Sequence, residues 1–245
     1  MRKILAVKIL LTCSFFMFSG CSSAPDSNQA HEKDPFEETN RSVFAFNLAV
    51  DDYVLEPAAK GLRALPQPVQ TSLRQHVQWT SMPSTTLNST LQGKAENAAL
   101  AGLNFAINGL TLGFVDLMEG EEQPEPEDFG QTLAGLGVGE GPYLVVPMVG
   151  SHTGRSLAGW GVDLVTNPFG TLTARTPDSV VLASVPVSAV SARATYFDTI
   201  NDVKYNSVDP YARARSAFYQ QRTGLLRDNL SDQQEDDAFD SFFSD

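Results

Sequence analysis

Apolar residues recur at intervals of three and four along most of the chain after residue 35, and this spacing predicts amphipathic helices. The clearest of these helices covers residues 36–53. Asp34 and Pro35 precede it and form a helix-start signal, with the acid as N-cap and the proline in the first turn. A strand-like run is confined to residues 143–146, so the chain is predicted to be mainly α. Further helices are expected over residues 69–80, 83–91, 154–165, 179–192 and 210–227.

The stretch from residue 97 to residue 115 contains no charged residue and is predicted to be a helix. Its nineteen residues are long enough to cross a membrane. Three glycines and several amide side chains lower its hydrophobicity, which favours two other placements. The helix can pack inside the protein or lie in a single leaflet of a bilayer. These two placements differ only in the direction that the apolar stripe faces, so both stay open.

Residues 1–20 have the features of a lipoprotein export signal, with a positive start, an apolar core and small residues before Cys21. We therefore expect Cys21 to become the first residue of the mature chain and to carry covalent lipid. Ser22 follows it, which favours sorting to the outer membrane. Two or three acyl chains hold a protein at a membrane far more firmly than one does. Residues 21–33 contain no large apolar residue and are predicted to be a flexible tether.

The charge of the mature chain excludes several classes of partner. Removal of residues 1–20 leaves 14 basic and 29 acidic residues, a net charge of −15, which repels nucleic acids and anionic lipid headgroups. Attachment to a membrane must therefore come from the lipid anchor and from apolar contacts. Cys13 leaves with the signal and Cys21 carries lipid, so no thiol remains for a disulfide or a cysteine metal site.

The residues that catalysis or cofactor binding would need do not have the required spacing. Glycines at alternate positions from 135 to 141 do not fit the dinucleotide fingerprint, and Pro142 follows them where a helix should begin. Ser151 and His152 are adjacent, but their surroundings do not match the nucleophile elbow of hydrolases. We therefore predict that the protein is not an enzyme and that it has no metal site and no cofactor besides the lipid on Cys21.

Composition also sets the expected domain boundaries. Residues 119–128 contain six acids and two prolines and are predicted to be a solvated loop. Residues 34–228 are expected to form one helical domain. The last segment, residues 229–245, is acidic and is predicted to be a disordered tail.

Four motifs follow one another along the body of the chain. The opening motif comprises Asp34, Pro35, Asn40, Arg41, Phe44, Phe46 and Asn47. A second motif covers residues 105–116, and a glycine-rich motif begins at residue 129 and includes Gly135, Gly137, Gly139, Gly141, Pro142, Tyr143, Pro147 and Gly150. The closing motif comprises Asp209, Pro210, Tyr211 and Arg215. In order and spacing over residues 34–222, these motifs resemble the MlaA (VacJ) family of outer-membrane lipoproteins.

This resemblance implies a ring-shaped helical domain whose amphipathic helices are embedded in the inner leaflet of the outer membrane, facing the periplasm. It implies that the protein associates with a trimeric porin. It also implies removal of mislocalised phospholipids from the outer leaflet through an amphipathic channel to a periplasmic carrier protein, which maintains lipid asymmetry. The helices over residues 36–53, 97–115 and 179–192 would then lie in the leaflet.

The resemblance also places the glycine-rich loop, from Gly135 to Gly150, beside the channel. Its glycines permit tight backbone turns and a gating movement. The alternative is that they only let the backbone change direction. The alternative function is structural: a lipoprotein scaffold that anchors a porin or another envelope partner. Phospholipid that purifies together with the protein would favour transport over the scaffold.

Overall fold

The computed structural model describes residues 34–169 and 184–243 of the 245-residue chain. The export signal, Cys21 and the tether lie outside the described residues, and so does the start of the helix expected over residues 179–192. The described part is mainly α, as predicted. Its helices are α2 Glu37–Val50, α3 Glu56–Arg63, α4 Gln67–Leu91, α5 Ala95–Asn108, α6 Phe129–Gly135, α7 Gly154–Thr166, α9 Ser184–Thr195, α10 Phe197–Tyr205 and α11 Pro210–Phe243.

Four shorter elements complete the described part. A π-helical turn, η2 (Asp51–Leu55), joins α2 to α3, and a 3-10 turn, η3 (Gly109–Thr111), ends α5. Strands β1 (Tyr143–Val146) and β2 (Gly150–Thr153) form an antiparallel hairpin with Tyr143 opposite Thr153. The strand predicted over residues 143–146 is confirmed, and the glycine-rich segment contains a hairpin.

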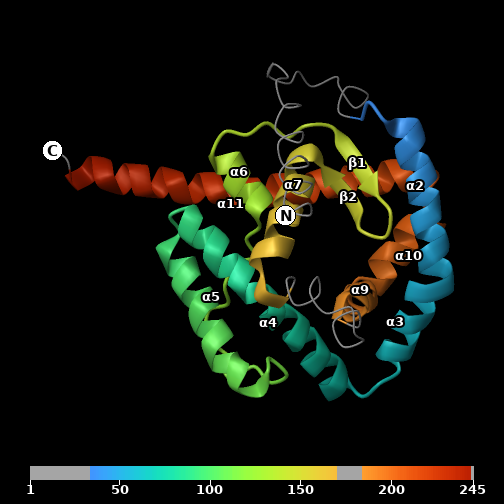
Figure 1. Ribbon diagram of the computed structural model, residues 1–245, viewed down its shortest axis with the longest axis horizontal. Coiled ribbons are helices and arrows are strands. Elements are labelled where there is room, and N and C mark those ends of the chain that lie inside the picture. The colour runs from blue at the N-terminus through green and yellow to red at the C-terminus, as the bar shows by residue number, and fades with distance from the viewer. Residues whose placement is uncertain (1–33, 170–183, 244–245) are drawn as a thin grey trace, which may run out of the picture. The chain divides into compact units, whose positions relative to one another are not determined.

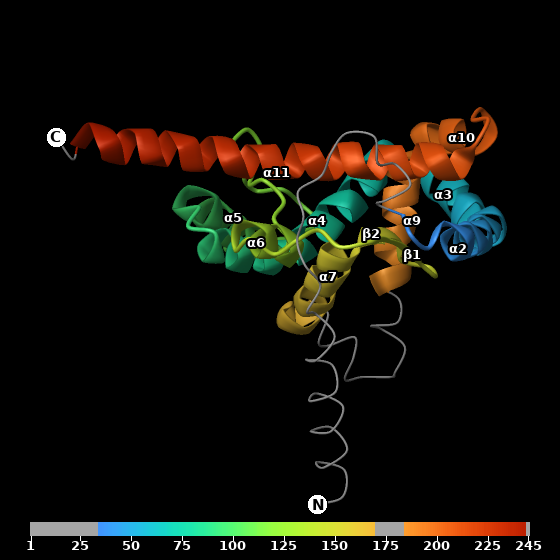
Figure 2. The same ribbon diagram turned by 90° about the horizontal axis from the view of Figure 1, so that it is seen from above.

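The elements after residue 36 close a ring of contacts (Figure 1). From α2 the path of contacts runs through η2 and α3 to α9, then to α4, and on through α6 and α7 to β2. Strand β1 returns it to α2. Helix α5 packs on α4, while α11 crosses one face of the ring and contacts α6, α10 and β2 (Figure 2). The end of α7 projects on the opposite face (Figure 2). The predicted ring-shaped helical domain is confirmed.

Two prolines that predict breaks between helices lie instead within continuous helices. Proline cannot donate a backbone hydrogen bond, and its ring clashes with the carbonyl four residues earlier. Pro57 follows η2 directly, where the Glu56 N–H donates to the carbonyl of Asp51 in a widened turn that interrupts the ordinary ladder. Pro83 lies inside α4, and the Asn167 amide donates to the nearby Thr80 carbonyl at 2.9 Å. Residues 69–91 therefore form part of one helix instead of two.

The uncharged stretch 97–115 is not helical over its whole length. Helix α5 ends at Asn108, η3 follows, and the chain then turns through Leu112 and Gly113 with positive φ angles of 53° and 73°. A Cβ atom on Gly113 would overlap the Cβ of Trp79, so only glycine fits against this tryptophan. Over the described residues, no helix combines the length and the apolar character that crossing a membrane requires.

The C-terminal third differs from the sequence-based expectation in three places. Helix α9 continues to Thr195, beyond the expected end at residue 192, and α10 has no counterpart among the predicted helices. Helix α11 does not end near residue 227 but extends to Phe243, through most of the segment expected to be a disordered tail. No glycine or proline occurs after Gly224 to stop it. This segment is rich in acids and poor in regularly spaced apolar residues, so apolar spacing does not predict the helix.

The acidic loop of residues 119–128 is only partly solvated. Pro124 is buried, and Glu127 is 6% exposed with its carboxylate 2.9 Å from the Lys94 ammonium. Burial raises the pKa of Glu127. The expectation of a solvated loop is therefore correct for residues 119–123. It is wrong for Pro124 and Glu127, which are buried.

The distribution of polar and apolar side chains is inverted relative to a water-soluble protein. Of the described residues, six hydrophobic and 17 polar or charged ones are buried, whereas 25 large hydrophobic side chains are exposed. The buried hydrophobic cluster is small and consists of Tyr143, Val145 and Tyr211, with Val43, Phe44, Phe218 and Tyr219 packed against it. Burial of apolar surface in a central core therefore cannot account for how the ring is held together.

Candidate functional site

Asp34 and Asn40 lie at the centre of a buried polar cluster that joins the two ends of the described chain. The Asn40 amide donates to Asp34 Oδ1 at 2.8 Å, and Arg215 Nη1 donates to Asp34 Oδ2 at 2.6 Å. The Tyr211 hydroxyl also donates to Asp34. The opening and closing motifs of the sequence therefore meet at one buried carboxylate. Asp34, Asn40, Asn47, Tyr143, Tyr211 and Arg215 are called the polar clasp below.

The N-cap role predicted for Asp34 is wrong. Helix α2 begins at Glu37, and no side chain caps its first turn. The carboxylate of Asp34 instead binds the side chains of Asn40, Tyr211 and Arg215, two of which come from the other end of the described chain. Asp34 therefore serves the tertiary structure rather than the start of the helix.

The pKa values of the clasp residues follow from burial and hydrogen bonding. Burial alone would raise the pKa of Asp34, but the hydrogen bonds from Tyr211, Arg215 and Asn40 outweigh it and lower that pKa. Burial, together with the Asp34 carboxylate, raises the pKa of the Tyr211 hydroxyl. The clasp therefore holds a carboxylate anion, a guanidinium cation and a neutral phenol.

Two asparagines on α2 hold the hairpin. The Asn40 amide donates to the Tyr143 carbonyl at 3.0 Å, and its oxygen accepts from the Val145 N–H at 2.9 Å. One heptad later, Asn47 donates to the Val146 carbonyl at 3.1 Å and accepts from the Met148 N–H at 2.8 Å. The two side chains thus satisfy backbone groups that an edge strand would otherwise leave unpaired. They join the glycine-rich motif to the opening motif.

The remaining residues of the opening and closing motifs surround the clasp. Phe44 packs edge-on against Tyr211 with ring centroids 5.6 Å apart. Arg41 Nη2 pairs with Asp209 at 2.7 Å, and the hydrogen bonds from Arg41 hold the pKa of Asp209 at about 2. Pro210 begins α11. Phe46 is half exposed and Pro35 is exposed, so neither contributes to the buried cluster.

The glycine-rich segment is exposed on both sides of Tyr143. Gly137, Gly141 and Gly150 have positive φ angles of 79°, 72° and 104°, which require glycine on backbone grounds. Gly135 ends α6, and a Cβ atom added to Gly139 would meet no other atom within 4 Å. Pro142 and Pro147 are exposed at the two ends of β1. Tyr143 is fully buried, with its hydroxyl 2.7 Å from Ser151 Oγ.

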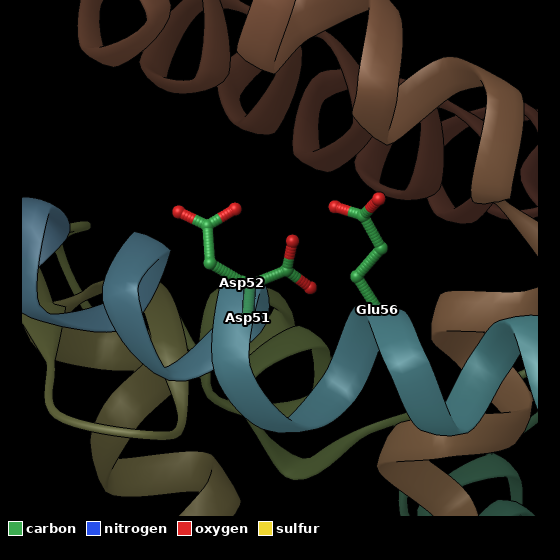
Figure 3. Close-up of side chains that lie close together, drawn as sticks. All are labelled: Asp51, Asp52 and Glu56. Atoms are coloured by element: carbon green, nitrogen blue, oxygen red, sulfur yellow. The ribbon is translucent and has the colours of Figure 1, made fainter.

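A second polar cluster joins η2 and α3 to α9 and α10. Asp51, Asp52 and Glu56 extend their carboxylates from η2 and the start of α3 (Figure 3). Lys204 Nζ lies 2.8 Å from Asp51 and 2.9 Å from Glu56, and it also pairs with Asp52. Arg193 Nε donates to Asp51 at 2.6 Å. The buried side chains of Arg193 and Lys204 pair with these carboxylates, so the described residues form an ion-pair network here.

Sequence reasoning misses this second cluster. The π turn places Asp51 and Glu56, which are five residues apart, on the same side of the helix. Their partners, Arg193 and Lys204, are distant in sequence, and Lys204 lies on α10, which the sequence does not predict. The spacing of the acids is therefore the only sequence feature that points to the cluster. Lys60 and Lys204 lower the pKa of Glu56 to about 2. Burial alone would lower the pKa of Lys204, but its hydrogen bonds to the three carboxylates outweigh burial and raise that pKa.

The residues considered for nucleophilic catalysis have other contacts. His152 Nδ1 lies 3.3 Å from Ser156 Oγ, while the Ser151 hydroxyl pairs with Tyr143. Asp163 accepts hydrogen bonds from Asn88 and from the Phe129 backbone. The pairing that a Ser-His-Asp triad requires is therefore not formed by these three residues.

The exposed apolar side chains gather on particular elements. They include Leu103 on α5 and Leu110, Leu112, Phe114, Val115 and Leu117 after it. Others lie around the hairpin at Leu136, Val138, Met148 and Val149, and on α7 at Trp160, Leu164 and Val165. These residues are called the apolar surface below. Burying a large apolar side chain is worth about 1.5–3 kcal/mol, so a surface of this size calls for contact with hydrocarbon or with a partner.

Among the clefts between the described elements, two bear on the function. One, of about 430 Å³, lies between α4, α5 and the loop after η3, and polar residues such as Asn104, Asn108 and Asp116 contribute to its wall. The other, of about 520 Å³, lies between α2, β2, α10 and α11 and is mainly apolar. The second cleft lies beside the polar clasp, because Phe44 and Phe218 contribute to both its wall and the packing around Tyr143.

The fold and the site define a class of protein: a helical ring held by buried polar contacts, with an apolar outer surface suited to a membrane. Comparison with known sequences identifies the family. The sequence model of the MlaA lipoprotein family matches residues 32–224. The chain belongs to this family.

Individual relatives agree with this assignment. The chain is 32% identical to the intermembrane phospholipid transport system lipoprotein MlaA of Haemophilus influenzae, with 87% of this chain and 88% of that protein covered. It is also 32% identical to the protein of the same name from Escherichia coli, with 82% and 81% covered. A solved structure described as the structural basis for maintenance of bacterial outer membrane lipid asymmetry matches with a TM-score of 0.63 and 29% identity. The match covers 77% of this chain and 96% of that one.

The clasp gives a first prediction, for the Asn40→Ala variant. The substitution leaves the Tyr143 carbonyl and the Val145 N–H without their buried partner, and each such loss costs about 1–3 kcal/mol. We expect the free energy of unfolding in detergent to fall by at least about 2 kcal/mol. Ser42→Ala, which removes one exposed hydrogen bond to the Glu38 carbonyl on the same helix, is the control and should cost less than about 1 kcal/mol. Equal losses in the two variants would contradict the role given to Asn40.

The ion-pair network gives a prediction about pH. The pKa of Glu56 is about 2 in the folded protein and 4.5 as the ordinary value. Its contribution to stability is therefore fully present above pH 4.5 and is lost as the pH falls toward 2. Glu56→Gln should be less stable than the wild type at pH 7, and the difference should shrink between pH 4.5 and 2. Unfolding curves at several pH values measure this, and a difference independent of pH would refute it.

Proposed function

We propose that this protein is an outer-membrane lipoprotein that removes mislocalised phospholipids from the outer leaflet and passes them to a periplasmic carrier protein. Its ring lies in the inner leaflet and faces the periplasm, anchored by lipid on Cys21. The observation that carries the proposal is the inverted distribution of side chains, with 25 large hydrophobic residues exposed and a mainly polar interior. The names of the relatives, which describe phospholipid transport, support it.

The physical problem that such a protein solves is the cost of moving lipid tails through water. Full exposure of a phospholipid with about thirty chain methylenes to water would cost about 25 kcal/mol of free energy, at about 0.8 kcal/mol for each methylene. Free transfer is therefore negligible, and the tails need continuous apolar cover while the headgroup stays hydrated. The protein needs no cofactor for this, and the lipid gradient or partner proteins supply the driving force.

A trimeric porin is the partner that the family resemblance implies in the membrane. The apolar surface has room for such a partner as well as for lipid, because it extends from α5 to α7 and the hairpin. On this proposal the porin holds the ring at a fixed depth, and lipid moves between the ring and the leaflet.

The proposal is tested in a bacterium that lacks its own relative of this protein. The wild-type chain should restore the exclusion of phospholipid from the outer leaflet. Leu103→Glu combined with Leu110→Glu, which places charge on two exposed leucines one heptad apart, should fail to do so. Gln67→Glu combined with Gln220→Glu adds the same charge at exposed polar positions and should act like the wild type. Outer-leaflet phospholipid measures the outcome, and failure of the wild type itself would reject the function.

The glycine-rich loop is proposed to gate the lipid path, and Gly139 is the position that tests this. A side chain at Gly139 would meet no atom within 4 Å, whereas Gly141 has a φ of 72° and its added Cβ would lie 3.4 Å from Gly154 Cα. Gly139→Val should therefore fold normally, and Gly141→Val should not. If Gly139→Val keeps its unfolding temperature but no longer restores lipid asymmetry, the loop must move during transport. Unchanged transport would mean that the glycines only turn the chain.

A further inference from the structure

The mainly apolar cleft beside the polar clasp lies between α2, β2, α10 and α11. Its volume is about 520 Å³, within the range of pockets that hold small ligands. Its wall is formed by Phe44 and Leu48 of α2, Ser151 of β2, Tyr196, residues of α10 and residues of α11. The apolar members from the last two helices are Ile200, Val203, Ala214, Ala217 and Phe218. This cavity is called the α10–α11 cleft below.

Small residues on α11 keep this cleft open. Ala214 and Ala217 are one helical turn apart and both contribute to the wall, where larger side chains would fill the space. Protein interiors are usually packed to the density of organic crystals, and apolar cavities attract apolar ligands rather than water. A cleft of this size beside the small hydrophobic cluster is therefore suited to an apolar occupant.

Charged residues place the mouth of the cleft on the water side of the protein. Exposed ion pairs join Arg213 to Asp202 and Arg41 to Asp209, on the same elements that build the cleft and next to them. Such exposed charges are costly in hydrocarbon. The apolar surface defined above lies on α5, α7 and the hairpin loops, while Tyr196, Tyr205 and Val208 are the exposed large hydrophobic residues near the cleft. A hydrocarbon chain in the cleft would thus be sheltered on a face that is itself in water.

We propose that the α10–α11 cleft holds one acyl chain of a phospholipid as the lipid leaves the membrane side of the ring. The proposal rests on the proposed function and adds the place where a tail is bound. Phe44, Ile200, Val203 and Phe218 cover the chain. The same wall contains polar groups at Ser151, Thr199 and Gln221 and the side chain of Lys204, whose ammonium pairs with Asp51, Asp52 and Glu56. A hydrated headgroup can remain at the mouth while the tail is covered.

Photolabelling tests where the tail lies. The full-length lipoprotein is purified in detergent with a phospholipid that carries a diazirine at the end of one acyl chain, and labelled residues are located by mass spectrometry after irradiation. We expect label on α10 at residues 199–203 and on α11 at residues 214–218. A lipid with the diazirine on its headgroup should not label these residues. Equal labelling by the two lipids, or label confined to α5 and α7, would overturn the proposal.

Ala217→Trp tests whether the cleft is needed. The indole fills the cleft, so we expect labelling of α10 by the tail probe to fall about tenfold, a change that corresponds to about 1.4 kcal/mol of binding free energy. The same variant should not restore lipid asymmetry in cells. Ser216→Trp is the matched control, because Ser216 is the exposed neighbour outside the cleft wall. Thermal unfolding shows whether each variant folds, and Ala217→Leu replaces the tryptophan variant if that one does not.

Failure of this inference can be told apart from failure of the proposed function. If the wild type and Ala217→Trp both restore lipid asymmetry, the protein transports lipid without the α10–α11 cleft, and only the inference is overturned. If the wild type does not restore it, the proposed function fails whatever the labelling shows.

Discussion

The hydrogen bonds around the buried Asp34 carboxylate and the Asn40 amide are the interaction on which the rest of the structure depends. A ring with an apolar outside cannot be held together by the hydrophobic effect alone, because lipid tails are as apolar as its own side chains. Polar contacts are stronger where they are buried than in water, because the local dielectric constant is low. Asn40 joins α2 to β1, and Asp34 joins the start of α2 to α11 through Tyr211 and Arg215.

The ion-pair network at η2 also holds neighbouring helices of the ring together, at another point. Asp51 and Glu56 hold Arg193 of α9 and Lys204 of α10, so charge complementarity fixes the contact of η2 and α3 with α9 and α10. A buried ion pair adds little net stability, because removing charges from water is costly, but breaking one partner leaves an uncompensated charge. Such contacts favour one closed arrangement of the helices over many alternatives.

The apolar surface, the polar clasp and the α10–α11 cleft each have a separate physical role in the proposed lipid transport. The exposed leucines and aromatic residues near α5 and α7 suit the leaflet, the polar interior keeps the ring closed, and the cleft offers a tail cover on the charged face. Glycines on either side of the buried Tyr143 have positive φ angles in the adjoining loops, while the tyrosine anchors the hairpin. The buried tyrosine therefore lies between two loops that contain glycine.

The sequence by itself determined the helical class, the hairpin strand and the motifs that matter, because apolar spacing, caps and turn residues act over a few neighbours. It placed Asn40, Tyr143 and Tyr211 in three separate motifs and could not show that they meet, since hydrogen bonds across more than a hundred residues depend on the path of the chain. Proline signals at Pro57 and Pro83 were misleading, because the helix continues through both positions, after a π turn at Pro57 and inside α4 at Pro83. Only the tertiary structure decided which polar residues are buried, how Lys204 pairs with three acids, and where a cleft remains open.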